Sequence, residues 1–215
     1  MSFDRRKFIN LGIGSIAGFA AGVVKSDTCD FFLTPEQPEG PFYPDAKTLD
    51  MDADLTKVKG HSKTAKGDLI VVKGIIQDQF CKPIENAIVE VWQACNSGKY
   101  NHPSDTSKAE LDPYFQYYAL MKTDSKGEYS FKSVIPGAYQ ASRNWVRPPH
   151  IHYKVSLRGY EELITQLYFK GHWLNQKDSI INNLNEEERS KVLVDFKKDE
   201  RGILTGQFII NIKKL

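Results

Sequence analysis

The sequence is organised around residues 136–152, which read Pro-Gly-Ala-Tyr-Gln-Ala-Ser-Arg-Asn-Trp-Val-Arg-Pro-Pro-His-Ile-His. His150 and His152 stand two residues apart, and the apolar residues Val155 and Leu157 follow them with the alternation of a strand. Alternate residues of an extended strand point to the same face, so both imidazoles can reach one point, as two ligands of one metal ion must. A histidine pair on a half-exposed sheet surface would show the same spacing.

The residues before this pair control how the chain enters the strand. Pro148 and Pro149 lack backbone donors and stiffen the entry. Pro136-Gly137 is typical of a turn and is expected to deliver Tyr139 into the same region. Two histidines with a tyrosine nearby make a candidate metal site.

Length and charge limit the class of protein. A chain of 215 residues suits one domain with a sizeable core and a processed or irregular end. Lys and Arg number 29 and Asp and Glu 27, a net charge of +2. This balance argues against a nucleic-acid partner, because nucleic-acid-binding proteins usually concentrate basic charge.

The first residues have the pattern of an export signal. Arg5-Arg6-Lys7-Phe8 precedes an uncharged, apolar run over residues 11–24, which is short for a membrane span of about 20 residues. The paired arginines resemble a twin-arginine signal. We therefore expect the twin-arginine export machinery to carry the protein out of the cytoplasm. The mature protein is expected to lack the export signal, residues 1–25, and to be periplasmic or extracellular. An uncleaved, membrane-anchoring end is the alternative.

Three cysteines, Cys29, Cys81 and Cys95, are compatible with one disulfide and a free thiol in an exported protein. Their spacing leaves the pairing open. None has a C-x-x-C partner, so we do not assign them to a metal.

The rest of the chain predicts an all-β fold. Residues 26–68 read as an extended arm and loop, because residues 34–44 hold four prolines and a glycine. Residues 69–215 are expected to form one domain, an antiparallel β-sandwich with one short C-terminal helix over residues 185–196. The expected strands cover residues 69–76, 87–93, 115–122, 129–134, 150–157, 163–169 and 206–212.

Eight motifs, in order along the chain, resemble the intradiol ring-cleavage dioxygenases. They are Glu39–Pro44, Val89–Ala94, Gly98–Tyr100, Asp112–Gln116, Thr123–Gly127, Pro136–Tyr139, Arg147–His152 and Thr165–Phe169. The resemblance implies a transthyretin- or prealbumin-like sandwich.

In this family two tyrosines and two histidines hold a non-haem ferric ion, Fe(3+). The matching positions are Tyr100, Tyr139, His150 and His152. The residue types suit this ion independently, because a phenolate is a hard anionic donor and two phenolates offset much of a trivalent charge. A tyrosine with an ordinary pKa of about 10 ionises at neutral pH only beside a strong cation.

The resemblance also implies the reaction. Dioxygen opens a catechol-type ring between its two hydroxylated carbons, and both oxygen atoms enter a cis,cis-muconate-type diacid. Tyr139 would leave the iron as substrate binds and act as a base. Arg147 would stabilise negative charge on the substrate, and Gln166 would support a ligating histidine.

The substrate pocket is expected to include Arg147 and the arm residues Gly40, Pro41 and Phe42. A compact sandwich with this arm resembles the protocatechuate 3,4-dioxygenase branch, in which two different subunits are used. This chain carries all four ligands itself, so a homo-oligomer or a monomer fits. Residues 138–144 differ from the protocatechuate pattern, which leaves the ring substituents open.

Two other functions fit the same fold. One is an exported transthyretin-like binding module with a vestigial metal site. The other is a copper or zinc site on the same side chains. The joint presence of Tyr100, Tyr139, His150 and His152 argues against the vestigial module, and metal analysis of the purified protein would separate iron from copper or zinc.

Overall fold

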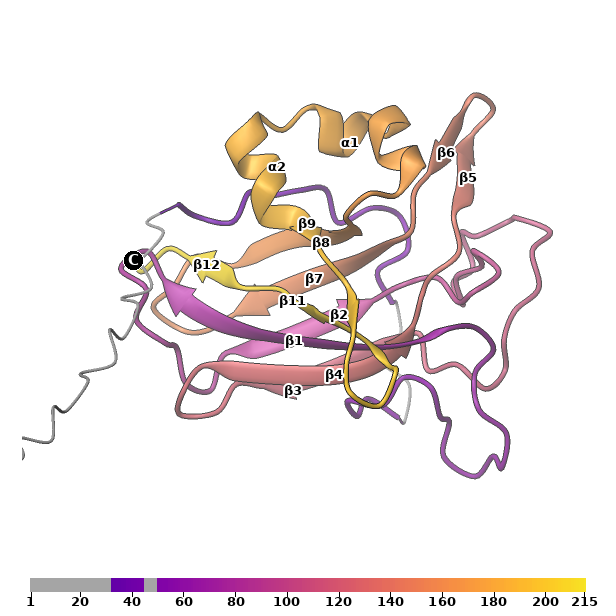
Figure 1. Ribbon diagram of the computed structural model, residues 1–215, viewed down its shortest axis with the longest axis horizontal. Coiled ribbons are helices and arrows are strands. Elements are labelled where there is room, and N and C mark those ends of the chain that lie inside the picture. The colour runs from indigo at the N-terminus through magenta and orange to yellow at the C-terminus, as the bar shows by residue number, and fades with distance from the viewer. Residues whose placement is uncertain (1–31, 45–49) are drawn as a thin grey trace, which may run out of the picture.

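The computed structural model describes residues 32–44 and 50–215 and contains two five-stranded sheets packed face to face (Figure 1). The elements in chain order are β1 (Leu69–Asp78), β2 (Ile88–Trp92), β3 (Tyr118–Lys122), β4 (Glu128–Val134), β5 (Tyr139–Ser142), β6 (Trp145–Arg147), β7 (His150–Ser156), β8 (Leu163–Phe169), η1 (Trp173–Lys177), α1 (Ser179–Asn182), α2 (Glu186–Val192), β9 (Leu193–Val194), β10 (Lys197–Lys198), β11 (Leu204–Gln207) and β12 (Ile210–Ile212). The expectation of a mostly β sandwich is confirmed.

The first sheet is built around β1, which pairs antiparallel with β4 on one side and parallel with β11 and β12 on the other. The expected all-antiparallel sandwich is therefore corrected to a mixed one. The single strand expected over residues 206–212 is also two strands. Between them, Phe208 buries its ring in the core, and its carbonyl accepts a hydrogen bond from the Tyr129 hydroxyl at 2.8 Å.

The second sheet has the order β3-β2-β7-β8-β9 and carries the histidine pair on its third strand. Its pairs are antiparallel except for β8 with β9, which is parallel. Apolar residues of the two sheets meet between them, for example Val72 of β1, Val91 of β2 and Val155 of β7, all fully buried. Alternation in each strand therefore places one face in a shared core.

Three short helices follow β8, where one was expected over residues 185–196. The expected helix is α2, which Asn185 caps through a capping box with Glu188, but it ends at Val192. Leu193 and Val194 pair with β8 instead. The elements η1 and α1 were not predicted, because five and four residues are too few for a helical period to show.

The stretch 136–152 holds a β5–β6 hairpin that the sequence analysis did not predict. The extended arm docks as expected: the Thr34 amide donates to the Asn211 carbonyl at 3.0 Å, and the Gln37 amide to the Ile164 carbonyl at 2.8 Å. Figure 1 shows the arm passing along the side of the sandwich that carries β8 and the helices.

The predicted export signal and Cys29 lie outside the described residues. Cys81 is disulfide-bonded, and Cys95 is a buried free thiol. Within residues 32–44 and 50–215, helices with the length and apolar character of a membrane span are absent.

Candidate metal and catalytic site

Strand β7 places His150 and His152 on one face, with their Nε2 atoms 3.2 Å apart and both side chains buried. Trp92 stands opposite His152 in the β2–β7 ladder. Its ring stacks on the His152 imidazole with centroids 4.9 Å apart and planes 9° from parallel. The neighbouring strand therefore fixes the orientation of this imidazole.

Two loops bring tyrosines to the histidines. Tyr100 follows β2, and its Oη lies 3.5 Å from His150 Nε2. Tyr139 begins β5, with its ring 5.5 Å from that of Tyr100 and 5.6 Å from that of His150. The structure thus gathers the four side chains that the sequence analysis selected as ligands.

A close approach between these two loops sets the spacing of the tyrosines. The Gly137 amide donates to the Cys95 carbonyl at 3.0 Å, which ties the start of the second loop to the first. Gly98 has a φ of +85°, and a Cβ there would lie 2.4 Å from the Ala138 carbonyl oxygen. A side chain at Gly98 would therefore push apart the two segments that carry Tyr100 and Tyr139.

Both histidines are held in the neutral form, which leaves an imidazole nitrogen of each able to bind a metal ion. His150 donates from Nδ1 to the Pro148 carbonyl at 2.7 Å, which leaves a lone pair on Nε2. Burial, and then the charge of Arg147, hold the pKa values of His150 and His152 well below the ordinary 6.5. Neutral imidazole is the form that binds metals.

The tyrosines need a cation in order to ionise. Burial is the main cause that raises the pKa values of Tyr100 and Tyr139. A buried phenol therefore stays protonated at neutral pH unless a strong positive charge lies against it.

The donor set fits a ferric ion. In the part of the chain that the structure describes, groups of three or more His, Cys, Asp or Glu able to hold a metal are absent, so a metal here depends on tyrosine oxygen. Two neutral imidazoles with two phenol oxygens combine nitrogen donors that suit iron with hard oxygen donors that suit a trivalent ion. The residues present therefore fit the group that the family resemblance implies.

Arg147 lies against His150, and several buried side chains hold its guanidinium. Its Nη1 is 3.2 Å from His150 Nε2, and its Nη2 donates to Gln166 Oε1 at 2.9 Å and to the Tyr168 hydroxyl at 2.8 Å. Its Nε donates to Asp178 at 2.9 Å, in an ion pair that is almost completely buried. The positive charge is thus fixed beside the candidate metal ligands.

Asp178 is the functional residue that the sequence analysis missed. It caps α1, where its Oδ1 accepts from the amides of Ile180 and Ile181 at 3.0 Å, and it also holds Arg147. An aspartate before Ser179 is a readable helix-capping signal. Its pairing with Arg147 is not readable, because 31 residues separate the two.

Gln166 links the site to the arm. It faces His152 in the β7–β8 ladder, and its Nε2 donates to the Pro38 carbonyl at 2.8 Å. The backbone amide of Gln166 donates to the Gln37 side-chain oxygen Oε1 at 2.9 Å. The arm therefore holds the glutamine that contacts Arg147.

The arm also forms one wall of a cavity in front of the site. Phe42 stacks on Tyr100 with ring centroids 4.5 Å apart, and a Cβ at Gly40 would lie 3.4 Å from His152. The cavity has a volume of about 440 Å³, which lies in the range of small-molecule sites. Gly40, Pro41, Phe42, Tyr139 and Arg147 all line it, so the predicted pocket residues lie together.

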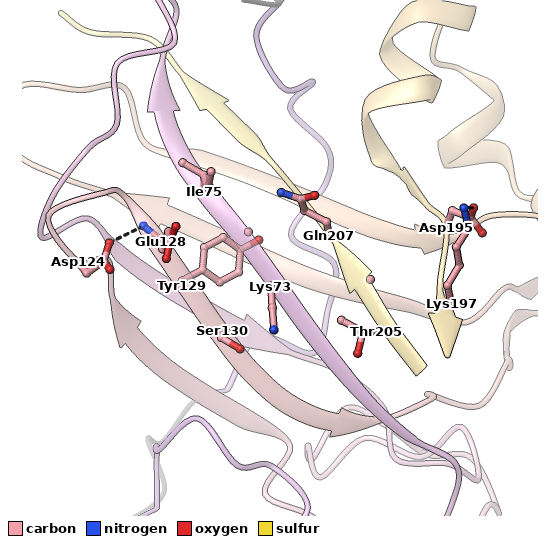
Figure 2. A pocket seen from close by; sticks show the side chains of 12 residues that line it. Lys73, Ile75, Asp124, Glu128, Tyr129, Ser130, Asp195, Lys197, Thr205 and Gln207 are labelled. Carbon is pink, nitrogen blue, oxygen red and sulfur yellow. Dashed lines mark hydrogen bonds and ion pairs between the residues drawn. The ribbon is translucent and has the colours of Figure 1, made fainter. Parts of the chain in front are cut away.

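A second hollow of about 740 Å³ lies over β1, β4 and β11, away from the histidines (Figure 2). Its described lining carries both signs of charge, including Lys73, Asp124 and Asp195, and includes none of the site residues. Figure 2 shows these side chains spread across the strands rather than directed at one point. The cavity beside the histidines is therefore the candidate site.

Comparisons with known proteins identify the family of this chain. A family model described as Dioxygenase matches residues 38–202, which includes every predicted site residue. The chain belongs to the intradiol dioxygenase family. The protocatechuate 3,4-dioxygenase beta chain of Burkholderia cepacia is 38% identical over 152 residues, covering 69% of this chain and 65% of that relative. The catechol 1,2-dioxygenase 2 of Acinetobacter lwoffii is 34% identical over 155 residues, covering 64% and 52%.

Solved structures share the fold of this family member. The 3-chlorocatechol 1,2-dioxygenase of Rhodococcus opacus has a TM-score of 0.68 at 22% identity, covering 84% of this chain and 72% of that one. The dioxygenase domain of a carbohydrate-binding fusion from Streptomyces sp. SirexAA-E has a TM-score of 0.64 at 23% identity, covering 86% and 100%. The chain thus spans 65% or less of the curated relatives above and the whole of one dioxygenase domain.

Proposed function

We propose that the protein is a non-haem ferric dioxygenase that opens a catechol-type ring between its two hydroxylated carbons and yields a cis,cis-muconate-type diacid. One observation carries the proposal: the His150 and His152 Nε2 atoms lie 3.2 Å apart with the Tyr100 Oη 3.5 Å from the first. Membership of the intradiol dioxygenase family supports it.

The residues that would hold the ion are Tyr100, Tyr139, His150 and His152. When bound there, a ferric ion would withdraw electron density from a catecholate and open its ring to attack by dioxygen. The ion would also stabilise the phenolate form of both tyrosines, whose pKa values burial otherwise raises.

Tyr139 is placed to act on the substrate's protons. It lines the cavity and is only half-buried, whereas Tyr100 is buried under Phe42. As a phenolate, its Oη would accept the proton of one catechol hydroxyl. The more accessible tyrosine is therefore assigned the role of base, and Tyr100 stays as a fixed ligand.

Arg147 and Gln166 would act on charge and position. The Arg147 guanidinium lines the same cavity and is held by Asp178, Gln166 and Tyr168, so it needs little reorganisation to stabilise negative charge on a bound catecholate. Gln166 would keep that guanidinium in place and would support His152 across the strand ladder.

A binding module on a transthyretin-like sandwich, with a vestigial or non-iron site, is the rival. The complete donor set and the charged residue behind it do not favour this rival, because a vestigial site has no need of a buried Arg147–Asp178 pair. We further propose export through a twin-arginine signal, on the pattern of residues 5–24.

The experiment is ring cleavage by the iron-loaded protein with ¹⁸O-labelled dioxygen. Catechol should give a diacid that carries one heavy oxygen atom in each carboxyl group, because both atoms of dioxygen enter the product before any exchange. Metal analysis should find iron at a ratio near one per chain. Absence of oxygen uptake with catechols, or tight retention of zinc that excludes iron, would contradict the proposal.

A further inference from the structure

The side chains that line the cavity determine which ring substituents of a catechol can bind. The hydroxyl-bearing edge of a catechol must face the histidines and tyrosines, so the opposite edge of the ring points toward the arm, the β5–β6 hairpin and α1. Pro38, Pro41, Trp145 and Ile180 contribute apolar side chains to the lining, and Ser104, Thr106, Ser107 and Gln140 contribute uncharged polar ones. A wall of apolar and uncharged polar side chains favours uncharged substituents such as hydrogen, alkyl or halogen.

The one cation among the described lining residues is already neutralised. Arg147 uses its Nε and Nη2 on Asp178, Gln166 and Tyr168, and its Nη1 faces His150. Asp178 is fully buried and contributes the opposite charge at 2.9 Å. These contacts hold the guanidinium at the histidine end of the cavity, with the charge of Asp178 beside it.

The one carboxylate among the described lining residues, Asp105, is paired with Lys99. Asp105 accepts from the Tyr100 amide at 2.7 Å and from the Ser107 amide at 2.9 Å, and it pairs with Lys99 at 3.3 Å. Burial raises the pKa of Asp105, but these hydrogen bonds outweigh it and hold the pKa below its ordinary value. The Asp105 carboxylate is thus ionised. Its ion pair with Lys99 leaves that lysine unavailable to a carboxylate of the substrate.

We propose that the substrate is a catechol whose ring carries no charged substituent, and that the site excludes 3,4-dihydroxybenzoate, the carboxylated catechol called protocatechuate. The inference rests on the proposed function and narrows its substrate class. Among the described lining residues a carboxylate would find no unpaired cation to replace its lost water, and an unpaired buried charge is strongly disfavoured. The apolar side chains of this wall would accept a methyl group or a chlorine atom at the same position.

Matched ligands test the charge alone. The probes are protocatechuate, its neutral and nearly isosteric amide 3,4-dihydroxybenzamide, and 4-methylcatechol, each titrated anaerobically into the iron-loaded full-length protein at pH 7.5. Binding is followed by calorimetry and by the visible spectrum. We expect 4-methylcatechol to bind at least about 100-fold more tightly than protocatechuate, with the amide between them. Protocatechuate affinity within about threefold of 4-methylcatechol would overturn the proposal.

A designed cation gives a second test at the cavity wall. Ile180→Lys adds a charge on an unbranched chain, and Ile180→Met adds a chain of similar shape without charge. The ratio of protocatechuate to 4-methylcatechol affinity should rise at least about tenfold in Ile180→Lys relative to Ile180→Met. An equal ratio in the two variants would show that charge at this wall does not decide the choice.

Oxygen uptake separates this inference from the function on which it rests. Selective binding of uncharged catechols without ring opening would support the inference and defeat the dioxygenase proposal. Equal ring opening of protocatechuate and 4-methylcatechol would do the reverse. Binding of neither ligand would overturn both.

Discussion

Arg147 is the residue on which most polar contacts of the site converge. Its guanidinium bonds Asp178, Gln166 and Tyr168 and lies 3.2 Å from His150. Lysine would keep the charge but could not reproduce a planar fork that reaches these partners at once. The side chain therefore acts through geometry as well as charge.

The first prediction follows from that geometry. Arg147→Lys should retain iron but lower kcat for catechol by about 10²–10³, the usual effect of losing one preorganised donor. The measurement is oxygen uptake together with iron content. Arg201→Lys is the control, because Arg201 forms an exposed ion pair with Asp199 and neither residue lines the cavity. Turnover of Arg147→Lys within about twofold of wild type would show that Arg147 is peripheral.

The buried histidines predict how the iron-free protein responds to pH. Burial and Arg147 hold the folded-state pKa values of His150 and His152 below the ordinary 6.5. Below about pH 6.5 the unfolded chain therefore binds protons that the folded chain does not, and stability falls as pH falls. The slope is about 1.4 kcal/mol per pH unit for each histidine. Above this pH both states are neutral there, and the contribution is constant.

Urea unfolding of iron-free protein between pH 7.5 and 5.5 measures this slope. The double variant His150→Gln, His152→Gln should show a clearly shallower loss of stability over the same range. An identical pH slope in wild type and variant would mean that the histidines are protonated in the folded state.

Most site residues could be predicted because each belongs to a local motif. His150 and His152 follow from strand alternation, and the structure places Tyr100 and Tyr139 against them. Asp178 could not be predicted in its second role, because its contact with Arg147 depends on how η1 and α1 fold over the sheet. Long-range pairing of this kind leaves no local pattern.

At the scale of elements, the spacing of the two tyrosine-bearing loops depends on Gly98. Gly98→Ala would place a Cβ 2.4 Å from the Ala138 carbonyl, and it would also strain a φ of +85°. We predict that Gly98→Ala holds less iron and shows a weaker visible band, because Tyr100 and Tyr139 are moved apart. Iron content and the absorption spectrum of the purified variant measure this.

Gly159→Ala provides the matched control. Gly159 has a φ of +90° with no atom within 4 Å of an added Cβ, so the variant bears the left-handed backbone cost of about 1–2 kcal/mol without the clash. It should lose stability and keep its iron. Equal iron content in the two glycine variants would show that the loop spacing does not control the site.

The elements themselves were predictable where hydrophobic alternation spans a whole strand. The expected strands 69–76, 129–134 and 163–169 match β1, β4 and β8 closely. The parallel pairing of β1 with β11 and β12 was not predictable, because strand direction in a sheet is set by the crossing of distant segments. The β5–β6 hairpin was not predictable from the sequence, because strands of four and three residues show too little alternation of apolar and polar residues.

At the scale of the whole molecule, the chain is expected to work outside the cytoplasm. We predict that the mature protein lacks residues 1 to about 25, on the pattern of Arg5-Arg6-Lys7-Phe8 before an uncharged apolar run. Mass spectrometry of the natively expressed protein gives the answer. Arg5→Lys, Arg6→Lys should leave the precursor uncleaved in the cytoplasm. A cytoplasmic wild-type protein that begins at Met1 or Ser2 would contradict this.

We propose above that two tyrosines and two histidines of one chain hold a ferric ion, which in turn binds a catechol. Electron transfer from phenolate to ferric iron absorbs visible light, whereas zinc, with a filled d shell, gives no such band. Tyr100→Phe and Tyr139→Phe should each weaken or shift the absorption, and His150→Ala or His152→Ala should reduce iron content. Tyr160→Phe, on a distant turn between β7 and β8, is the control and should leave the spectrum unchanged.

Visible absorption of the iron-loaded protein, titrated with 4-methylcatechol without oxygen, is the most direct test. We expect a coloured protein whose band moves to longer wavelength as the catechol binds and then decays when oxygen is admitted. A colourless protein that retains zinc, and whose spectrum does not respond to the catechol after iron loading, would contradict a ferric site on these tyrosines and histidines.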